Sequence, residues 1–87
     1  MTLEFTNAFE ADYDHLRNQI QKQTHKALKL LAANPQHPSL QVKRIQGTHD
    51  VWEARVTLAY RLTFNWKGDL ITLRRVGMHD ILKKKKK

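Results

Sequence analysis

Apolar residues in the first part of the chain recur at steps of three and four. Between residues 9 and 33 this spacing is typical of an amphipathic helix, and Thr6 or Asn7 can cap its start. One straight helix of this length would run about 37 Å at ~1.5 Å per residue, which exceeds the width of so small a domain. We therefore expect a break near residues 17–18 and two antiparallel helices. The prolines within residues 34–38 end the second helix.

The second part of the chain has the period of two that is typical of strands. β-Branched and aromatic residues alternate there with polar ones and predict strands over residues 51–56, 60–66 and 70–76, with a plausible fourth over 40–46. Gly47 marks a turn, and Gly68-Asp69 suits a two-residue hairpin. Helices followed by strands predict an α+β fold, in which two N-terminal helices pack on one face of a twisted, mostly antiparallel four-stranded sheet.

The register of the predicted sheet decides which side chains share a face. If residues 57–59 form a loop, Trp52 faces Phe64 and Ala54 faces Leu62 on an apolar face. Because side chains alternate along each strand, the opposite face carries Arg55, which lies opposite Arg61.

On the same polar face Glu53 lies opposite Thr63, and the hairpin at Gly68 adds Arg74 beside Thr63. Like charges directly opposite one another in a sheet cost about 0.2–1 kcal/mol, so the converging arginines need a balancing charge. Two interpretations remain open. In one, Glu53 and Asp50 neutralise part of an ordinary solvated face. In the other, the guanidinium groups form an anion site, because their forked donors match phosphate oxygens.

Charge is unevenly distributed along the 87 residues. Sixteen basic and eight acidic residues give +8, but residues 83–87 are all lysine, and without them eleven basic against eight acidic residues give +3. We expect one domain over residues 1–82 with a basic tail over 83–87. The basic excess favours nucleic acid or an acidic protein as partner. The chain has no cysteine, no long apolar run and no signal-peptide pattern, so we expect a cytoplasmic protein without a membrane span.

The inventory of reactive residues excludes several kinds of catalysis. The chain has no cysteine and a single serine, Ser39, and its three glycines are too far apart for a phosphate-binding loop. No histidines have the spacing of a metal site, so we expect neither a metal nor a cofactor. Gly77 is expected to turn the chain and bring His79 to the rim of the arginine cluster. The remaining chemistry is one in which the substrate supplies the nucleophile, as the 2′-hydroxyl of RNA does.

Five segments, taken in order and spacing, resemble the RelE/ParE superfamily of toxins from bacterial toxin–antitoxin pairs. The resemblance covers nearly all of residues 5–82, and its segments are 34–40, 43–47, 52–56, 60–64 and 73–80. It implies two N-terminal helices on a twisted antiparallel sheet. It also implies one of two activities: the RelE and YafQ branches cut messenger RNA in the ribosomal A site without metal and leave a cyclic phosphate, whereas ParE poisons DNA gyrase.

The resemblance also implies roles for individual residues. Arg61 would stabilise the phosphate and the transition state, and His79 would be the general acid. Arg55 matches a basic position that contacts the RNA backbone. The tyrosine near the C-terminus of the RelE branch has no counterpart, and we take Glu53 as the general base.

Further RNA contacts are expected from Lys43, Arg44, Arg74 and Arg75. The partners implied are an acidic antitoxin, messenger RNA and the ribosome. A toxin that inhibits gyrase without catalysis, or a module that binds RNA and does not cut it, are the alternatives.

Overall fold

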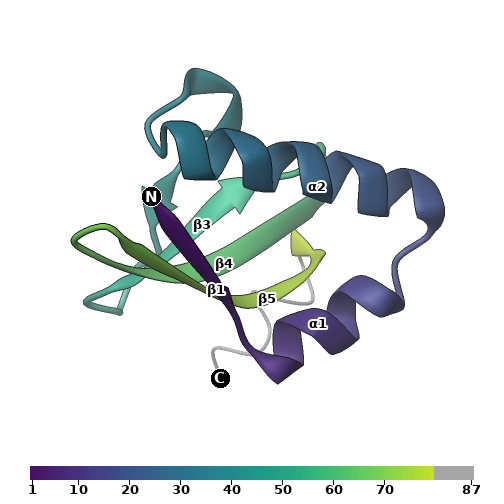
Figure 1. Ribbon diagram of the computed structural model, residues 1–87, viewed down its shortest axis with the longest axis horizontal. Coiled ribbons are helices and arrows are strands. Elements are labelled where there is room, and N and C mark those ends of the chain that lie inside the picture. Colours follow the sequence, from purple (N-terminus) through teal and green to yellow (C-terminus); the bar gives the residue numbers. More distant parts are fainter. Residues whose placement is uncertain (80–87) are drawn as a thin grey trace.

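Residues 1–79 are described by a computed structural model, in which two helices cover a five-stranded sheet (Figure 1). The helices are α1 (Asn7–Asp14) and α2 (Asn18–Ala33), followed by a 3-10 turn, η1 (Pro38–Leu40). The strands are β1 (Thr2–Phe5), β2 (Lys43–Arg44), β3 (Val51–Arg55), β4 (Tyr60–Lys67) and β5 (Leu70–Met78). The predicted α+β architecture is confirmed. The lysine tail expected at 83–87 lies outside the described residues.

The two helices divide where the length argument places the break. Thr6 caps α1, because its hydroxyl accepts a hydrogen bond from the backbone N–H of Phe9 at 3.1 Å. Residues 15–17 then separate α1 from α2, which crosses one face of the sheet (Figure 1). One stripe of α2 is buried there: Ile20, Thr24, Ala27, Leu28 and Leu31. In the part of the chain that the structure describes, no helix is long and apolar enough to span a membrane.

The face of the sheet under the helices forms the core. The side chains of Leu62 and Phe64 from β4 and of Ile71 and Leu73 from β5 are fully buried against Leu31 of α2. Each such burial contributes about 1.5–3 kcal/mol relative to an exposed side chain. This apolar layer holds the register of the strands, since a slip of one residue would turn the layer toward solvent.

The sheet has one strand more than the sequence pattern predicts. Its order is β1-β5-β4-β3-β2, and β1 lies parallel to β5, with Thr2 opposite Leu70 and Phe5 opposite Leu73. The other pairings are antiparallel. Leu3 of β1 packs against the core and Phe5 contacts the ring of Phe9, but Phe5 is half exposed and four residues are too few to show a strand period in the sequence.

The strand predicted over residues 40–46 is much shorter in the structure. Only Lys43–Arg44 pair with β3, while Pro38–Leu40 form η1. The turn is fixed by the imidazole Nδ1 of His37, which accepts the backbone N–H of Ser39 at 3.2 Å. Gln41 follows with a left-handed φ of 46°, a conformation that ends η1 and delays the strand.

Candidate functional site

The register between β3 and β4 places two arginines directly opposite one another. Arg55 pairs with Arg61, and the preceding pair is Ala54 with Leu62, both fully buried in the core. Side chains alternate along a strand, so Arg55 and Arg61 both leave the sheet on the face opposite the core. Arg55 lies at the open edge of β3, where it also borders a pocket shared with residues of α2 and η1. The predicted pairings of β3 with β4 are confirmed.

The turn between β3 and β4 closes without a glycine. The hydroxyl of Thr57 accepts hydrogen bonds from the backbone N–H groups of Ala59, at 3.3 Å, and Tyr60, at 3.1 Å. The side chain of Arg61 folds back over this turn, and its Nη1 donates to the carbonyl oxygens of Thr57 (2.7 Å), Leu58 (3.1 Å) and Tyr60 (3.1 Å). One guanidinium nitrogen thus fixes the side chain. The Nε and Nη2 donors have no protein partner among residues 1–79.

His79 is hydrogen-bonded to the same turn through its backbone. Its backbone N–H donates to the carbonyl of Ala59 at 2.8 Å, directly after β5 ends at Met78. Gly77, which lies opposite Arg61, was expected to turn the chain, and this prediction is wrong: Gly77 is inside β5 and its φ is not positive. The antiparallel pairing of β4 with β5 brings His79 beside the turn instead.

Arg74 and Arg75 do not have the positions that the sequence predicts. The pairing of Phe64 with Leu73 is confirmed, but a bulge between Thr63 and Phe64 puts Arg75, and not Arg74, opposite Thr63. Arg74 extends toward the hairpin, where its Nη1 donates to the side-chain oxygen of Asn65 at 3.1 Å. The side chains of Arg61 and Arg74 therefore point along the sheet in opposite directions, and three arginines do not converge.

Arg75 is held by an acidic residue of α1. Its Nε and Nη2 donate to the carboxylate of Asp12 at 2.7 and 3.1 Å. These hydrogen bonds raise the pKa of Arg75 above its ordinary value, and the attraction of the Asp12 charge adds to this, while partial burial opposes both effects. The charge of Arg75 is balanced within the protein, unlike that of Arg61.

Glu53 is almost buried, at 9% exposure, and its partner is Lys43, at 3.6 Å between Nζ and Oε2. No ion pair within residues 1–79 involves Arg55 or Arg61, so neither Glu53 nor Asp50 neutralises the arginines by direct contact. Two neighbouring positive charges without an ion-pair partner in the described chain lie beside the turn. Such a pair can bind an anion, such as a phosphate, whose oxygens accept hydrogen bonds from several N–H groups.

The remaining basic and histidine residues are spread over the fold. Lys43 lies opposite Glu53, whereas Arg44 lies opposite Trp52, so their side chains leave opposite faces of the sheet. The imidazole Nδ1 of His15 lies 2.7 Å from the carbonyl of Ala11. Within residues 1–79 no three histidine or acidic side chains gather in a way that could hold a metal ion.

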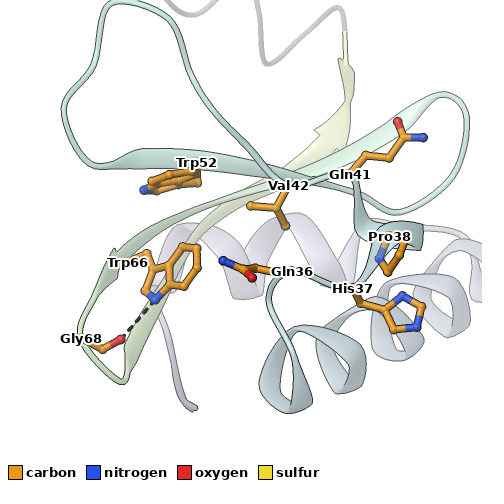
Figure 2. A pocket seen from close by; sticks show the side chains of 8 residues that line it. All are labelled: Gln36, His37, Pro38, Gln41, Val42, Trp52, Trp66 and Gly68. Atoms are coloured by element: carbon orange, nitrogen blue, oxygen red, sulfur yellow. Dashed lines mark hydrogen bonds between the residues drawn. The ribbon is translucent and has the colours of Figure 1, made fainter.

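A pocket of about 590 Å³ at the hairpin end of the sheet was not foreseen. Trp52 and Trp66 form one wall, and the segment from Gln36 to Val42 forms the other (Figure 2). The sequence pattern assigns Trp52 to the core face, which is correct, and Trp66 packs against the core on the same face. It carries no signal that α2 ends before it covers them, and only the packing of residues 36–42 reveals the opening.

Comparison with known proteins identifies a family and a shared fold. Residues 3–82 match the family described as ParE toxin of type II toxin-antitoxin system, parDE. No curated protein is similar enough in sequence to count as a relative.

Among solved structures, YafQ from E. coli strain BL21(DE3) has a TM-score of 0.78 at 17% identity, over 93% of this chain and 96% of that chain. RelE in the RelB–RelE antitoxin–toxin complex from Methanococcus jannaschii has a TM-score of 0.77 at 24% identity, over 94% and 96% of the two chains. The YoeB/ParE toxin from Agrobacterium tumefaciens has a TM-score of 0.77 at 15% identity, over 91% and 99%. These structures share the fold, and since the family match spans nearly the whole sequence, the chain belongs to the family of ParE toxins of type II toxin–antitoxin systems.

Proposed function

We propose that this toxin is an endoribonuclease, an mRNA interferase that cuts messenger RNA on the ribosome in the cytoplasm without a metal ion and so inhibits translation. The observation that carries the proposal is the pair Arg55 and Arg61, neither of which forms an ion pair among residues 1–79, beside the turn whose Ala59 carbonyl accepts the backbone N–H of His79. Guanidinium donors that stabilise negative charge and an imidazole that donates a proton are groups that can promote cleavage of a phosphodiester bond.

The chemistry uses the nucleophile that RNA itself carries. The 2′-oxygen forms a bond to the adjacent phosphorus while the bond from phosphorus to the 5′-oxygen breaks, which leaves a cyclic phosphate and a 5′-hydroxyl. Arg61 and Arg55 stabilise the negative charge that develops on the phosphate oxygens. His79 gives a proton to the departing 5′-oxygen, and Glu53 is the proposed base that takes the proton of the 2′-hydroxyl.

The other basic residues differ in how accessible their charges are to RNA. Lys43 and Arg74 are exposed and lie on the face that carries Arg55 and Arg61, so they extend the path for the RNA backbone. Arg44 is proposed to contact RNA from the opposite face. Arg75 already binds Asp12, so its contribution to RNA binding depends on that ion pair opening.

Cleavage of a reporter message in a cell-free translation extract tests the proposal. We expect His79→Gln and Arg61→Ala each to slow cleavage by about 10²–10³-fold, the usual effect of losing one group that stabilises a transition state. His49→Gln and Arg17→Ala are the matched controls, because both residues are exposed and distant in sequence from the turn. If wild type leaves the message intact, or the His79 and Arg61 variants cut as fast as the controls, the ribonuclease proposal is wrong.

A second candidate function is inhibition of DNA gyrase, and the matched family description, ParE toxin of parDE, favours it. Such a toxin acts by docking and needs no general acid beside an arginine pair. Gyrase supercoiling and RNA cleavage measured on the same preparation separate the two functions. Gyrase arrest without RNA cleavage, unchanged in His79→Gln, would replace the ribonuclease proposal.

We further propose an acidic antitoxin as the natural partner. Solved structures with this fold include complexes named RelB–RelE and DinJ–YafQ. The basic excess of this chain, +8 overall, would attract a negatively charged protein and speed its association. A small acidic protein encoded beside this one, copurifying with it and suppressing its activity, is the expected finding.

A further inference from the structure

The pocket beside Trp52 and Trp66 lies apart from the arginine pair. It is on the helix-facing side of the sheet and at the hairpin end, whereas Arg55 and Arg61 are on the other face beside the opposite turn. Trp66 is five residues from Arg61 along β4, or about 17 Å at ~3.4 Å per residue. The pocket is therefore a separate site.

Two indole rings give the pocket an aromatic wall. Their centroids are 5.3 Å apart and their planes meet at 64°. The indole N–H of Trp66 donates to the carbonyl of Gly68 at 3.1 Å, which fixes that ring in the hairpin (Figure 2). Both tryptophans are only partly buried, so aromatic surface is left open to a flat ligand.

The opposite wall offers neutral groups that can both donate and accept. The carboxamide of Gln36 extends toward Trp66, whereas that of Gln41, at the far side of the pocket, points away from the tryptophans (Figure 2). The Gln36 carboxamide has no hydrogen-bond partner among residues 1–79. An aromatic wall for stacking and a free carboxamide for edge contacts are the groups that recognise an unstacked nucleobase.

The charge around the pocket favours a ligand that carries phosphates. Residues 34–49 supply most of the second wall and contain no acidic residue. Arg44 lies opposite Trp52 on β2 and on the same face, so a fixed positive charge flanks the aromatic wall. A nucleotide fits this combination better than an apolar side chain of an acidic protein, which would leave the Gln36 carboxamide unused.

We propose that this pocket binds one unstacked base of single-stranded RNA, as a second contact away from the bond that is cut. The inference rests on the proposed function only in taking RNA as the ligand, and it needs no catalysis. It gives the toxin a means of holding RNA by a base, whereas the arginine pair holds the backbone.

Tryptophan fluorescence of the full chain is a direct test, because Trp52 and Trp66 are its only tryptophans. The probes are a short single-stranded RNA with 2′-O-methyl groups, which cannot be cut, and an abasic strand of equal length and charge. We expect the base-containing strand to quench the fluorescence and the abasic strand to leave it unchanged. Equal quenching by both strands, or by neither, would overturn the proposal.

Variants assign the effect to the pocket. Trp52→Leu and Gln36→Leu should weaken binding of the labelled RNA by roughly tenfold, the effect of losing one stacked or paired base. Phe5→Leu is the control, since Phe5 is an exposed aromatic residue outside the pocket. Gln36 is exposed in a loop, so its variant serves even if Trp52→Leu is poorly folded. If Phe5→Leu and Gln36→Leu weaken RNA binding equally, the base does not bind in this pocket and the inference is wrong.

The test separates this inference from the proposed function. His79→Gln should slow cleavage by about 10²–10³-fold and keep the base-dependent quenching. Quenching in a wild-type protein that cuts no RNA would support the pocket and refute the ribonuclease. Cleavage without base-dependent quenching would support the ribonuclease and refute the pocket. Quenching by an acidic peptide in place of RNA would identify the pocket as a protein-docking site and overturn the inference.

Discussion

Arg61 combines a structural and a chemical task in one side chain. Its Nη1 bonds three carbonyl oxygens of the turn at residues 57–60, while the other donors of the guanidinium have no protein partner in the described chain. Lysine could not do both, because an ammonium group lacks the rigid fork of donors. The turn therefore orients the group that we propose for phosphate binding. A change in the turn should affect the site even when the arginine remains.

Thr57→Ala tests this link. The variant removes the oxygen that accepts the N–H groups of Ala59 and Tyr60, and we expect a loss of about 1 kcal/mol in the free energy of unfolding. Urea denaturation followed by tryptophan fluorescence measures it. Thr2→Ala, on the exposed edge strand, is the control and should change stability little. If the two variants are equally stable, the hydroxyl of Thr57 does not hold the turn.

At the scale of elements, β5 pairs with β4 along one edge, and its other edge has two different neighbours. Its first half pairs with β1 as far as Leu73, and its second half lies against α1. There the hydroxyl of Thr6 donates to the carbonyl of Leu73 at 2.9 Å, and the carboxylate of Asp12 accepts the backbone N–H of Val76 at 3.1 Å. Polar side chains from α1 and its N-cap thus form hydrogen bonds with backbone groups at the edge of β5, which a neighbouring strand would otherwise bond.

Asp12→Asn should therefore loosen β5 and the site at its end. We expect a loss of roughly 1–2 kcal/mol in unfolding free energy, between the values for an exposed ion pair and for a hydrogen bond to a buried charge. Asp14→Asn on the same helix is the control, because Asp14 is exposed and forms no ion pair within residues 1–79. An equal effect of both substitutions would contradict the assignment.

The pH dependence of this ion pair follows from the raised pKa of Arg75. A raised pKa in the folded state means that the stabilisation is fully present below the ordinary arginine pKa and is lost only as the pH rises through the raised value. The stability difference between wild type and Asp12→Asn should accordingly stay constant from neutral to mildly alkaline pH. Unfolding at several pH values checks this, and a marked decline over that range would show that Arg75 is not the partner.

At the scale of the whole molecule, charge is divided along the chain. Residues 1–14 contain four acidic residues and no basic ones, whereas residues 83–87 add five positive charges. Long-range attraction of RNA depends on the net charge of the whole chain, whereas the proposed cleavage depends on a few side chains at the site. Affinity and cleavage should therefore respond differently to loss of the tail.

Removing residues 83–87 should flatten the salt dependence of RNA binding. Each phosphate contact that is lost lowers the slope of log affinity against log salt by about 0.7 for a single strand. The rate of cleavage at saturating protein should be unchanged. Binding titrations at several salt concentrations, with cleavage measured in parallel, make the comparison. A loss of cleavage at saturation would show that the tail takes part in the chemistry.

The predictions that succeeded rest on local or nearly local patterns. The break between the helices follows from chain length, and the pairing of Arg55 with Arg61 follows from alternation around a short turn. The predictions that failed depend on contacts between distant segments. A bulge in the pairing of β4 with β5 puts Arg75 opposite Thr63 in place of Arg74, and Gly77 stays in the strand because β5 pairs with β4 as far as Met78.

The sequence by itself determined the α+β class, the identity of the core face and the side of the sheet that carries the arginines, because burial of one face permits a single register. Only the tertiary structure decided that β1 adds to the edge beside β5, that Asp12 binds Arg75 across 63 positions, and that the tryptophans border an open pocket. The physical reason is that these contacts join residues far apart in the chain. Their partners are chosen by packing of the whole fold, which no periodic pattern of single residues records.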